Sequence, residues 1–578
     1  MVVVRLINDW HDRVESLYLV RKKAAMRSSE PLHHFVDDYL AYLHESEPTS
    51  AAFDGVHIYD DLLEDVSRSA VESEIRELGG LARRLGLIDS STLSGVERIE
   101  RPMLDAHIRA RLHSLEAVRE WERNPHLYGE LLASSLTTQA IFDYAPAADR
   151  ARRVVSKLRQ TPRLIHAAKE NVTDPPGLFI KLGLETFRGV LSFIEDDLPR
   201  AFVDVDDLHL LGDLVDASTE AVTAITEYIQ YLESELAPQA KGSFRLGRQV
   251  FEEKLRLEEG IDLSCPRLLD IAMDELRKTQ ESFRHHAGRL GGDDLEKAWQ
   301  AAKHQHPASG ELASVAQKQL AELTTYIERN GIVTLLPGDG VTVAPTPNFF
   351  RWTFASMWTP GPFETKPMRA YYYLTDVDQQ WSSERQEEHL RDFNYGALWA
   401  ISIHEVYPGH YLHYQHLKRI RSKLRKSIMF SATSFVEGWA HYCEQMMVDE
   451  GFGEGDPLIR LGQLSESLIR LARFVVGIRL HAEDLSVEQG MRFFRDEAFM
   501  EESNARREAE RGTFDPGYVV YAAGKLMLAK LREDYEAQEG SKFTLKKFHD
   551  QLLANGGVPI PIHRRLMLND PRGTLFES

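Results

Sequence analysis

The segment at residues 404–410, His-Glu-Val-Tyr-Pro-Gly-His, brings together residue types that bind and use metal ions. The zinc-peptidase signature His-Glu-x-x-His places two histidines one helical turn apart, with a glutamate beside the first. Here His410 comes two residues late, and Pro408 stands at the expected position. At about 100° per residue, a spacing of six leaves His404 and His410 on different faces of an unbroken helix. Because proline disrupts a helix, we expect Pro-Gly to form a two-residue looped-out insertion that returns His410 to His404.

A third metal ligand is expected from the downstream segment Phe-Val-Glu-Gly-Trp-Ala-His. Catalytic zinc sites use three protein ligands and keep a fourth position open. Glu437 stands in a Glu-Gly-Trp-Ala sequence that resembles the Asn-Glu-Gly-aromatic-Ala element of the aminopeptidase N-like gluzincins, which supplies their third ligand. We therefore predict that His404, His410 and Glu437 hold one Zn²⁺ per chain. Cobalt, nickel or manganese also suit imidazole and carboxylate ligands.

Glu405, beside the first histidine, is the candidate general base. We predict that it takes a proton from the metal-bound water, while the metal lowers the pKa of that water and polarises the scissile carbonyl. A second interpretation stays open, in which His404 and His410 cap a kinked helix and the acidic residues are ordinary helix surface. The Glu-Gly-Trp-Ala segment favours the metal.

The composition excludes some classes of partner. The formal net charge is −20, from 89 acidic and 69 basic residues, which argues against nucleic acid and against an anionic membrane surface. Two cysteines, Cys265 and Cys443, cannot build a disulfide framework. We see no apolar run of about 18 residues and no secretory signal at the start, so we expect a soluble, cytoplasmic protein.

Helical periodicity dominates the chain, with one exception. Residues 1–330 are mostly helical in pattern, whereas residues 332–378 are rich in Val, Thr and Tyr and broken by Pro and Gly. We predict a mainly α fold with a small β-sheet just before the helix of His404. The expected division is an N-terminal helical region, 1–330, and a catalytic region, 331–578, packed as one compact unit. The segment Met-Arg-Ala-Tyr-Tyr-Tyr-Leu-Thr-Asp is a candidate edge strand for an extended peptide.

The two central motifs resemble a known bacterial family, domain of unknown function 885, which is placed among gluzincin-like metallopeptidases. Its hallmark is His-Glu-x-x-Pro-Gly-His followed by Glu-Gly-Trp-Ala, and both stand in this chain. Weaker similarity extends over most of the chain, including the closing Pro-Gly segment near residue 517. The resemblance implies a large helical metallopeptidase-like fold around a deep cleft, with zinc and a peptide substrate.

Three positions depart from the family pattern: His413 and Tyr518 replace glutamines, and His441 replaces a leucine. Their spacing allows His413 and His441 to face the site, where either one orients a metal ligand or alters the metal preference. Surface or core histidines are an equal alternative. Tyr521 matches the tyrosine of the family, and we predict that its phenol donates to the oxyanion of a tetrahedral intermediate. A buried core tyrosine is the other interpretation.

Further polar residues complete the expected site. Glu444 lies on the same predicted helix face as Glu437 and is a candidate for contact with a ligand or substrate. Arg507 and Arg511 are candidates to receive a substrate carboxylate. The leading hypothesis is a zinc-dependent peptidase acting on short peptides. The alternatives are a metal-dependent amidase or esterase of a small molecule and a non-catalytic helical binding protein with a relic metal site. The oligomeric state and the mode of cleavage stay open.

Overall fold

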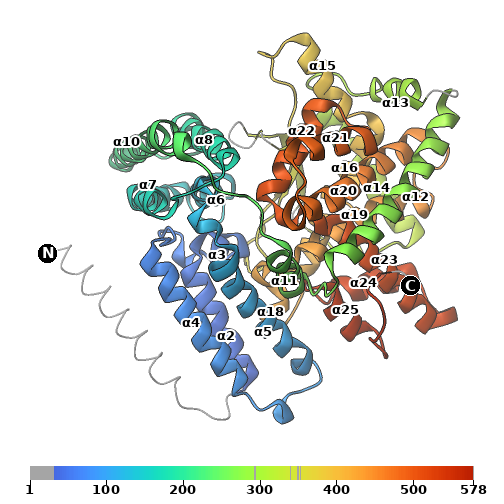
Figure 1. Ribbon diagram of the computed structural model, residues 1–578, viewed down its shortest axis with the longest axis horizontal. Helices are drawn as coiled ribbons and strands as arrows, with labels where there is room; N and C mark the ends of the chain where they lie inside the picture. The colour runs from blue at the N-terminus through green and yellow to red at the C-terminus, as the bar shows by residue number, and fades with distance from the viewer. Residues whose placement is uncertain (1–30, 292–294, 339, 348–350, 352, 577–578) are drawn as a thin grey trace.

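The computed structural model describes residues 31–291, 295–338, 340–347, 351 and 353–576. It is mainly helical and contains one small sheet, which confirms the fold class expected from the sequence. In Figure 1 the N-terminal helices lie on one side and the helices of the C-terminal half on the other. None of the helices in the described ranges is long and apolar enough to cross a membrane.

The N-terminal helices form two packed groups with separate apolar cores. One core joins helices α6 to α10, and the other joins α2, α4 and α5 to Leu424, Phe430, Val558 and Ile562. The bounds are α2 Leu32–Ser46, α3 Pro48–Asp54, α4 Arg68–Gly86, α5 Glu97–His113, α6 Pro125–Ile141, α7 Ala147–Asn171, α8 Gly177–Ser192, α9 Leu198–Ala201 and α10 Leu208–Tyr231.

The largest core starts earlier in the chain than the expected division at residue 330. It runs from Phe251 to Phe576, so helices α11 to α14 pack with the residues that follow 331. The reason is the apolar stripe on α12, which packs along α20. The bounds are α11 Arg248–Glu259, α12 Cys265–Gly291, α13 Leu295–Lys303, α14 Leu312–Asn330, α15 Ser383–Asp392, α16 Tyr395–Glu405, α17 His410–Leu417, α18 Lys423–Lys426, α19 Thr433–Asp449, α20 Pro457–Ala482, α21 Val487–Glu497, α22 Glu502–Phe514, α23 Val520–Glu539, α24 Leu545–Leu553 and α25 Ile560–Met567.

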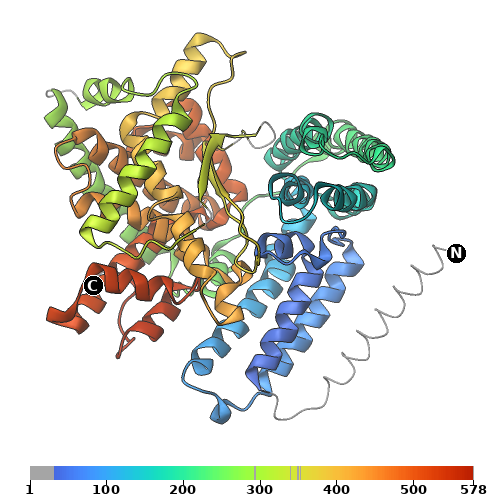
Figure 2. The ribbon, with the colours of Figure 1, turned by 180° about the vertical axis from the view of Figure 1, so that it is seen from behind.

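The sheet has three strands, β1 Val341–Pro345, β2 Ala355–Trp358 and β3 Ala370–Leu374. Their order is β1-β3-β2, with β3 parallel to β1 and antiparallel to β2. The expectation that the tyrosine-rich strand is an edge is therefore wrong, because β3 is paired on both sides. Figure 2 shows the strands where the two halves of the molecule meet.

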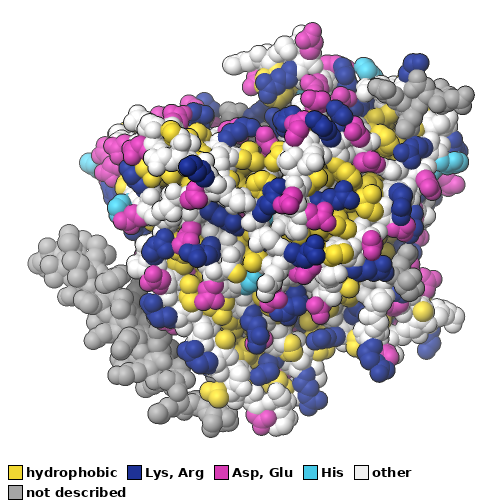
Figure 3. Space-filling model, viewed as in Figure 1, with side chains coloured by type: hydrophobic (Ala, Val, Ile, Leu, Met, Phe, Trp, Pro, Cys, Tyr) yellow, Lys and Arg dark blue, Asp and Glu magenta, His cyan; other side chains and the backbone are white. Residues whose placement is uncertain are grey.

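Polar contacts tie the two halves together at separate places. Near the sheet, His57 lies between Asp60 and Glu364, with its Nε2 2.6 Å from Glu364 Oε1. At another point Lys181 of α8 lies 3.1 Å from Glu510 of α22. On the face drawn in Figure 3, the described Lys and Arg side chains are interspersed with Asp and Glu.

Candidate metal centre

The Pro-Gly segment divides one expected helix into two. Helix α16 ends at Glu405 and α17 begins at His410. Across the break, Gly409 N donates to Ile403 O at 3.0 Å, and Leu412 N donates to Val406 O at 3.3 Å. Both hydrogen bonds span six residues, whereas an α-helical bond spans four. The local geometry is therefore that of two extra residues, as the spacing of the histidines predicted.

The break is held by close backbone packing. A Cβ on Gly409 would lie 1.8 Å from the carbonyl oxygen of His404, so only glycine fits. The indole of Trp439 donates to the carbonyl oxygen of Pro408 at 3.0 Å. The Trp of the Glu-Gly-Trp-Ala motif thus fixes the loop of the first motif, which explains why a buried tryptophan stands there.

Helix α19 brings Glu437 to the two histidines and lies very close to α23. A Cβ on Gly438 would be 2.7 Å from Gly524 of α23, and one on Gly524 would be 1.9 Å from the carbonyl oxygen of Ser434. The motif glycine therefore allows backbone-to-backbone contact between the helices. The same contact brings the start of α23, with Tyr521, towards Glu437.

Three side chains converge with one ligand atom each. Glu437 Oε2 lies 3.4 Å from His404 Nε2 and 3.6 Å from His410 Nε2, and all three ligand atoms lie within 4.8 Å of one another. The two imidazole rings are perpendicular, with centroids 4.7 Å apart. No other group of three or more metal-ligating side chains is present in the described ranges.

The donor set fits a divalent cation such as zinc. His404 Nδ1 lies 2.6 Å from Glu444 Oε1, so the neutral ring carries its proton there and turns the lone pair of Nε2 towards Glu437. Two electron-rich atoms then face each other, an arrangement that a cation between them stabilises. Burial lowers the pKa of His404, but the hydrogen bonds to Glu437 and Glu444 outweigh it and raise the pKa to about 9, so a proton on Nε2 competes with a cation for the place beside Glu437. The surroundings therefore favour positive charge at this point.

A buried network lies behind His404. Glu444 is fully buried and accepts hydrogen bonds from His404 and from His441 Nδ1 at 3.2 Å. Arg470 of α20 lies 3.2 Å from the same carboxylate and also pairs with Glu466. Burial opposes ionisation of Glu444, but the charge of Arg470 and the two histidines lower its pKa well below the usual range. Glu444 is therefore an anion that orients His404.

Glu405 differs from Glu444 in having no partner. The side chain is half-buried and forms no hydrogen bond or ion pair with any residue in the described part of the chain. Burial raises the pKa of Glu405, although the neighbouring His404 and His410 act in the opposite direction. A carboxylate with a raised pKa and free oxygens is suited to accepting a proton.

Tyr521 and Arg511 lie together on the side of α22 and α23. Arg511 Nη2 donates to the Tyr521 hydroxyl oxygen at 3.3 Å and pairs with Asp515 at 2.8 Å. Burial and the charge of Glu437 raise the pKa of Tyr521 to about 12, against the effect of Arg511. The phenol thus keeps its proton and has it available to donate.

The remaining sequence candidates have different places. His413 is fully buried, and neither of its ring nitrogens has a hydrogen-bond partner in the described structure. Burial, followed by His410, lowers its pKa to about 3, so it is a neutral core side chain. Arg507 is exposed on α22, where its charge adds to the effect of burial in lowering the pKa of His389 on α15. The structure therefore does not bring Arg507 to the three ligands.

Tyr518, the third departure from the family pattern, is a core residue. Its ring fills the space left by two glycines, because a Cβ on Gly512 or Gly477 would lie 2.1 or 2.7 Å from it.

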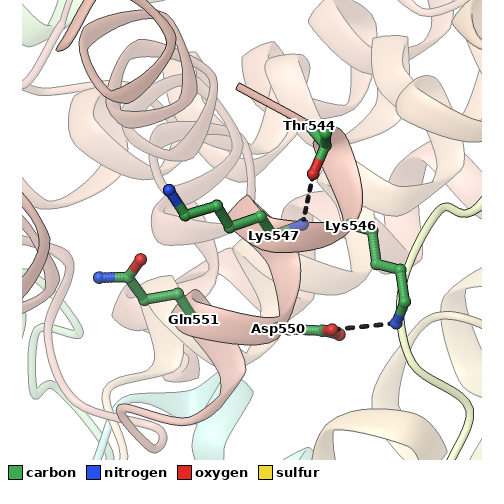
Figure 4. A pocket seen from close by; sticks show the side chains of 5 residues that line it. All are labelled: Thr544, Lys546, Lys547, Asp550 and Gln551. Carbon is green, nitrogen blue, oxygen red and sulfur yellow. Dashed lines mark hydrogen bonds and ion pairs between the residues drawn. The ribbon is translucent and has the colours of Figure 1, made fainter. Parts of the chain in front are cut away.

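A surface pocket of about 510 Å³ lies elsewhere, along α24, and is drawn in Figure 4. Its Lys546 is paired with Asp550 at 3.0 Å. The pocket contains none of the candidate site residues.

Sequence reasoning missed Arg470. It lies 66 residues beyond His404, in the segment Ser-Leu-Ile-Arg-Leu-Ala-Arg, where an arginine has the pattern of a surface residue. The only local signal is Glu466, one turn earlier on the same helix, which is typical of an exposed ion pair.

Comparisons with known proteins agree with the fold and the motifs. The model of the family described as bacterial protein of unknown function (DUF885) matches residues 48–567. The chain belongs to this family. None of the curated proteins compared with the chain matches it.

Two solved structures resemble this member of the DUF885 family over nearly its full length. One, from Shewanella oneidensis, is described as a candidate lipoprotein of unknown function; it has a TM-score of 0.77 and 26% identity, and the match covers 93% of this chain and 100% of that chain. The other, a candidate lipoprotein from Colwellia psychrerythraea, has a TM-score of 0.76 and 18% identity, covering 91% of this chain and 96% of that chain. They show that the fold is shared.

Proposed function

We propose that the protein is a zinc-dependent peptidase acting on short peptides. The observation that carries this proposal is the convergence of the ligand atoms of His404, His410 and Glu437 within 4.8 Å, next to the unpaired carboxylate of Glu405. Two imidazoles and one carboxylate are one of the protein ligand sets found in catalytic zinc sites, which keep a fourth position open.

Each residue has a role that follows from its surroundings. A bound zinc ion supplies Lewis acidity, which polarises a carbonyl group and acidifies water. Glu405 accepts a proton from water and passes it to the leaving amine, since its oxygens are uncommitted and its pKa is raised by burial. Tyr521 donates a hydrogen bond to the oxygen of the attacked carbonyl group. Glu444 holds the His404 ring in the tautomer that presents Nε2.

The first test separates metal binding from catalysis. Protein purified without chelator or a nickel column is analysed for metal, and we expect close to one zinc per chain. The variant His404→Ala is expected to lose it. Glu405→Gln is expected to keep the zinc and to lose about 10²- to 10⁴-fold in turnover of a peptide from a screened panel, since general-base catalysis contributes that much.

The other outcomes identify the competing functions. Zinc binding with full turnover in Glu405→Gln would remove Glu405 from its role. Turnover of non-peptide amides or esters, without turnover of peptides, would replace the peptidase by a small-molecule hydrolase. Absence of zinc even after its addition would leave a helical binding protein with a relic site.

A further inference from the structure

A tyrosine that the proposed chemistry does not yet use lies on the helix of His410. Tyr414 follows His410 by four residues on α17, so the two side chains lie on the same face of that helix. His410 Nε2 on this face points to Glu437 of α19, against which α17 packs. Tyr414 therefore faces the side on which the ligand atoms converge.

The hydroxyl of Tyr414 is the unusual feature. The side chain is half-buried, yet its hydroxyl has no hydrogen-bond partner in the described part of the chain. Phenols enclosed in a protein normally find a partner, as Tyr521 does with Arg511, and Tyr442 with His549. The hydroxyl of Tyr518 also has none, but that side chain is fully enclosed. Of these two, Tyr414 is the one whose side chain is only partly buried, so a ligand can reach it.

The charges of two carboxylates act on the Tyr414 hydroxyl. Burial, then Glu437, then Asp54 of α3 raise the pKa of Tyr414 to about 12, so both carboxylates lie near it. Asp54 already accepts hydrogen bonds from His44, Ser427 Oγ and Ile428 N. The Tyr414 hydroxyl, on the His410 face of α17, thus feels the charge of the candidate ligand Glu437 and that of Asp54, and its proton is uncommitted.

We infer that the Tyr414 hydroxyl contacts the substrate and donates a second hydrogen bond, beside that of Tyr521, to the oxygens of the tetrahedral centre formed when water adds to the carbonyl carbon. This inference rests on the proposed peptidase function. Addition of water to a carbonyl carbon, with one proton passed to Glu405, leaves two oxygens that share one proton and one negative charge until the bond to the amine breaks. Two phenols from different helices, α17 and α23, match those two oxygens, and neither phenol needs to lose its proton.

The test uses the full-length zinc-loaded chain and the variant Tyr414→Phe, which removes only the hydroxyl. A dipeptide analogue with a phosphinate in place of the scissile amide serves as probe, because it mimics the tetrahedral centre. We expect unchanged zinc content, a Kd for the phosphinate raised about 10- to 100-fold, and kcat lowered by a similar factor with little change in KM. The control is Tyr395→Phe, an exposed phenol on α16, which should behave as wild type.

The outcomes distinguish the inference from the proposed function. Wild-type protein that binds the phosphinate and cleaves peptides, with Tyr414→Phe within about twofold of it, would overturn the inference alone. Loss of zinc in Tyr414→Phe would also overturn it, because the residue would then support the metal site. Zinc-loaded wild type that neither binds the phosphinate nor cleaves any peptide would overturn the proposed function, and the inference with it.

Discussion

The two histidines of the centre have very different surroundings. His404 lies against a buried wall, where Glu444, His441 and Arg470 form a connected network. The His410 side chain is slightly more exposed, 11% against 7%, and its Nδ1 is buried without a partner in the described ranges. The residues that hold His404 in place are thus bonded to one another, although His441 Nε2 and Arg470 Nε have no partner in the described ranges, whereas the Glu405 carboxylate has no side-chain partner there at all.

The side chains that position His404 are therefore different from the side chains that can react with a substrate. A paired side chain is held in one orientation and is costly to disturb. Replacing an unpaired side chain costs less stability, but the replacement is expected to lower the rate of the reaction. The variants below test that distinction, in order of decreasing free-energy change.

The largest effect is expected from Arg470→Met, which leaves the carboxylates of Glu444 and Glu466 without their shared cation. Breaking a buried ion pair costs about 3–5 kcal/mol, and the free energy of unfolding in urea measures it. The matched control is Arg159→Met of α7, whose pair with Asp213 is about half exposed on both sides. It should cost about 0–1 kcal/mol. Equal losses of unfolding free energy in the two variants would show that the buried network stabilises the fold no more than an exposed ion pair does.

An intermediate effect is expected from Glu444→Gln. The amide keeps the shape but holds His404 less firmly, and outer partners of metal ligands contribute about 10- to 100-fold to metal affinity. Competition with a zinc chelator measures the change. Glu466→Gln contacts Arg470 but not His404, so it should leave the zinc affinity as in wild type. Unchanged affinity in Glu444→Gln would show that the network does not support the ligand.

The smallest effect is expected from His441→Leu, which restores the family residue. Glu444 loses one of three partners but keeps His404 and Arg470. Burial lowers the pKa of His441 to about 3, so the variant removes a neutral donor and no charge. We expect zinc affinity to fall by less than about 1 kcal/mol, or about fivefold, in the same competition assay. Complete loss of zinc would make His441 an essential part of the centre.

The local part of the site was predictable from the sequence. The spacing of His404 and His410 and the proline between them predicted the break that the hydrogen bonds show. Which residues of a longer helix face the site was not predictable from the sequence. Arg507 and Arg511 are four residues apart on α22, yet one is exposed and the other lies against Tyr521. Which of them turns towards the site depends on how α22 packs, and that is not encoded in the spacing.

Non-local pairing accounts for the other differences. The tyrosine-rich β3 was expected at an edge, but strand order depends on which segments meet in space. Likewise, α12 packs along α20, so the largest core begins at Phe251. Mainly helical structure followed from periodicity alone, because each amphipathic stripe is a local property.

The contact between Gly438 and Gly524 has a consequence for how this family can change over time. A side chain at either position would collide with backbone, not with another side chain, so no second substitution nearby can make room for it. The two positions are therefore expected to be inherited as a unit. A relative that carries any other residue at one of them has moved α19 away from α23, and with it the carboxylate that completes the ligand set. Such a relative would be expected to keep the fold and to have lost the metal site.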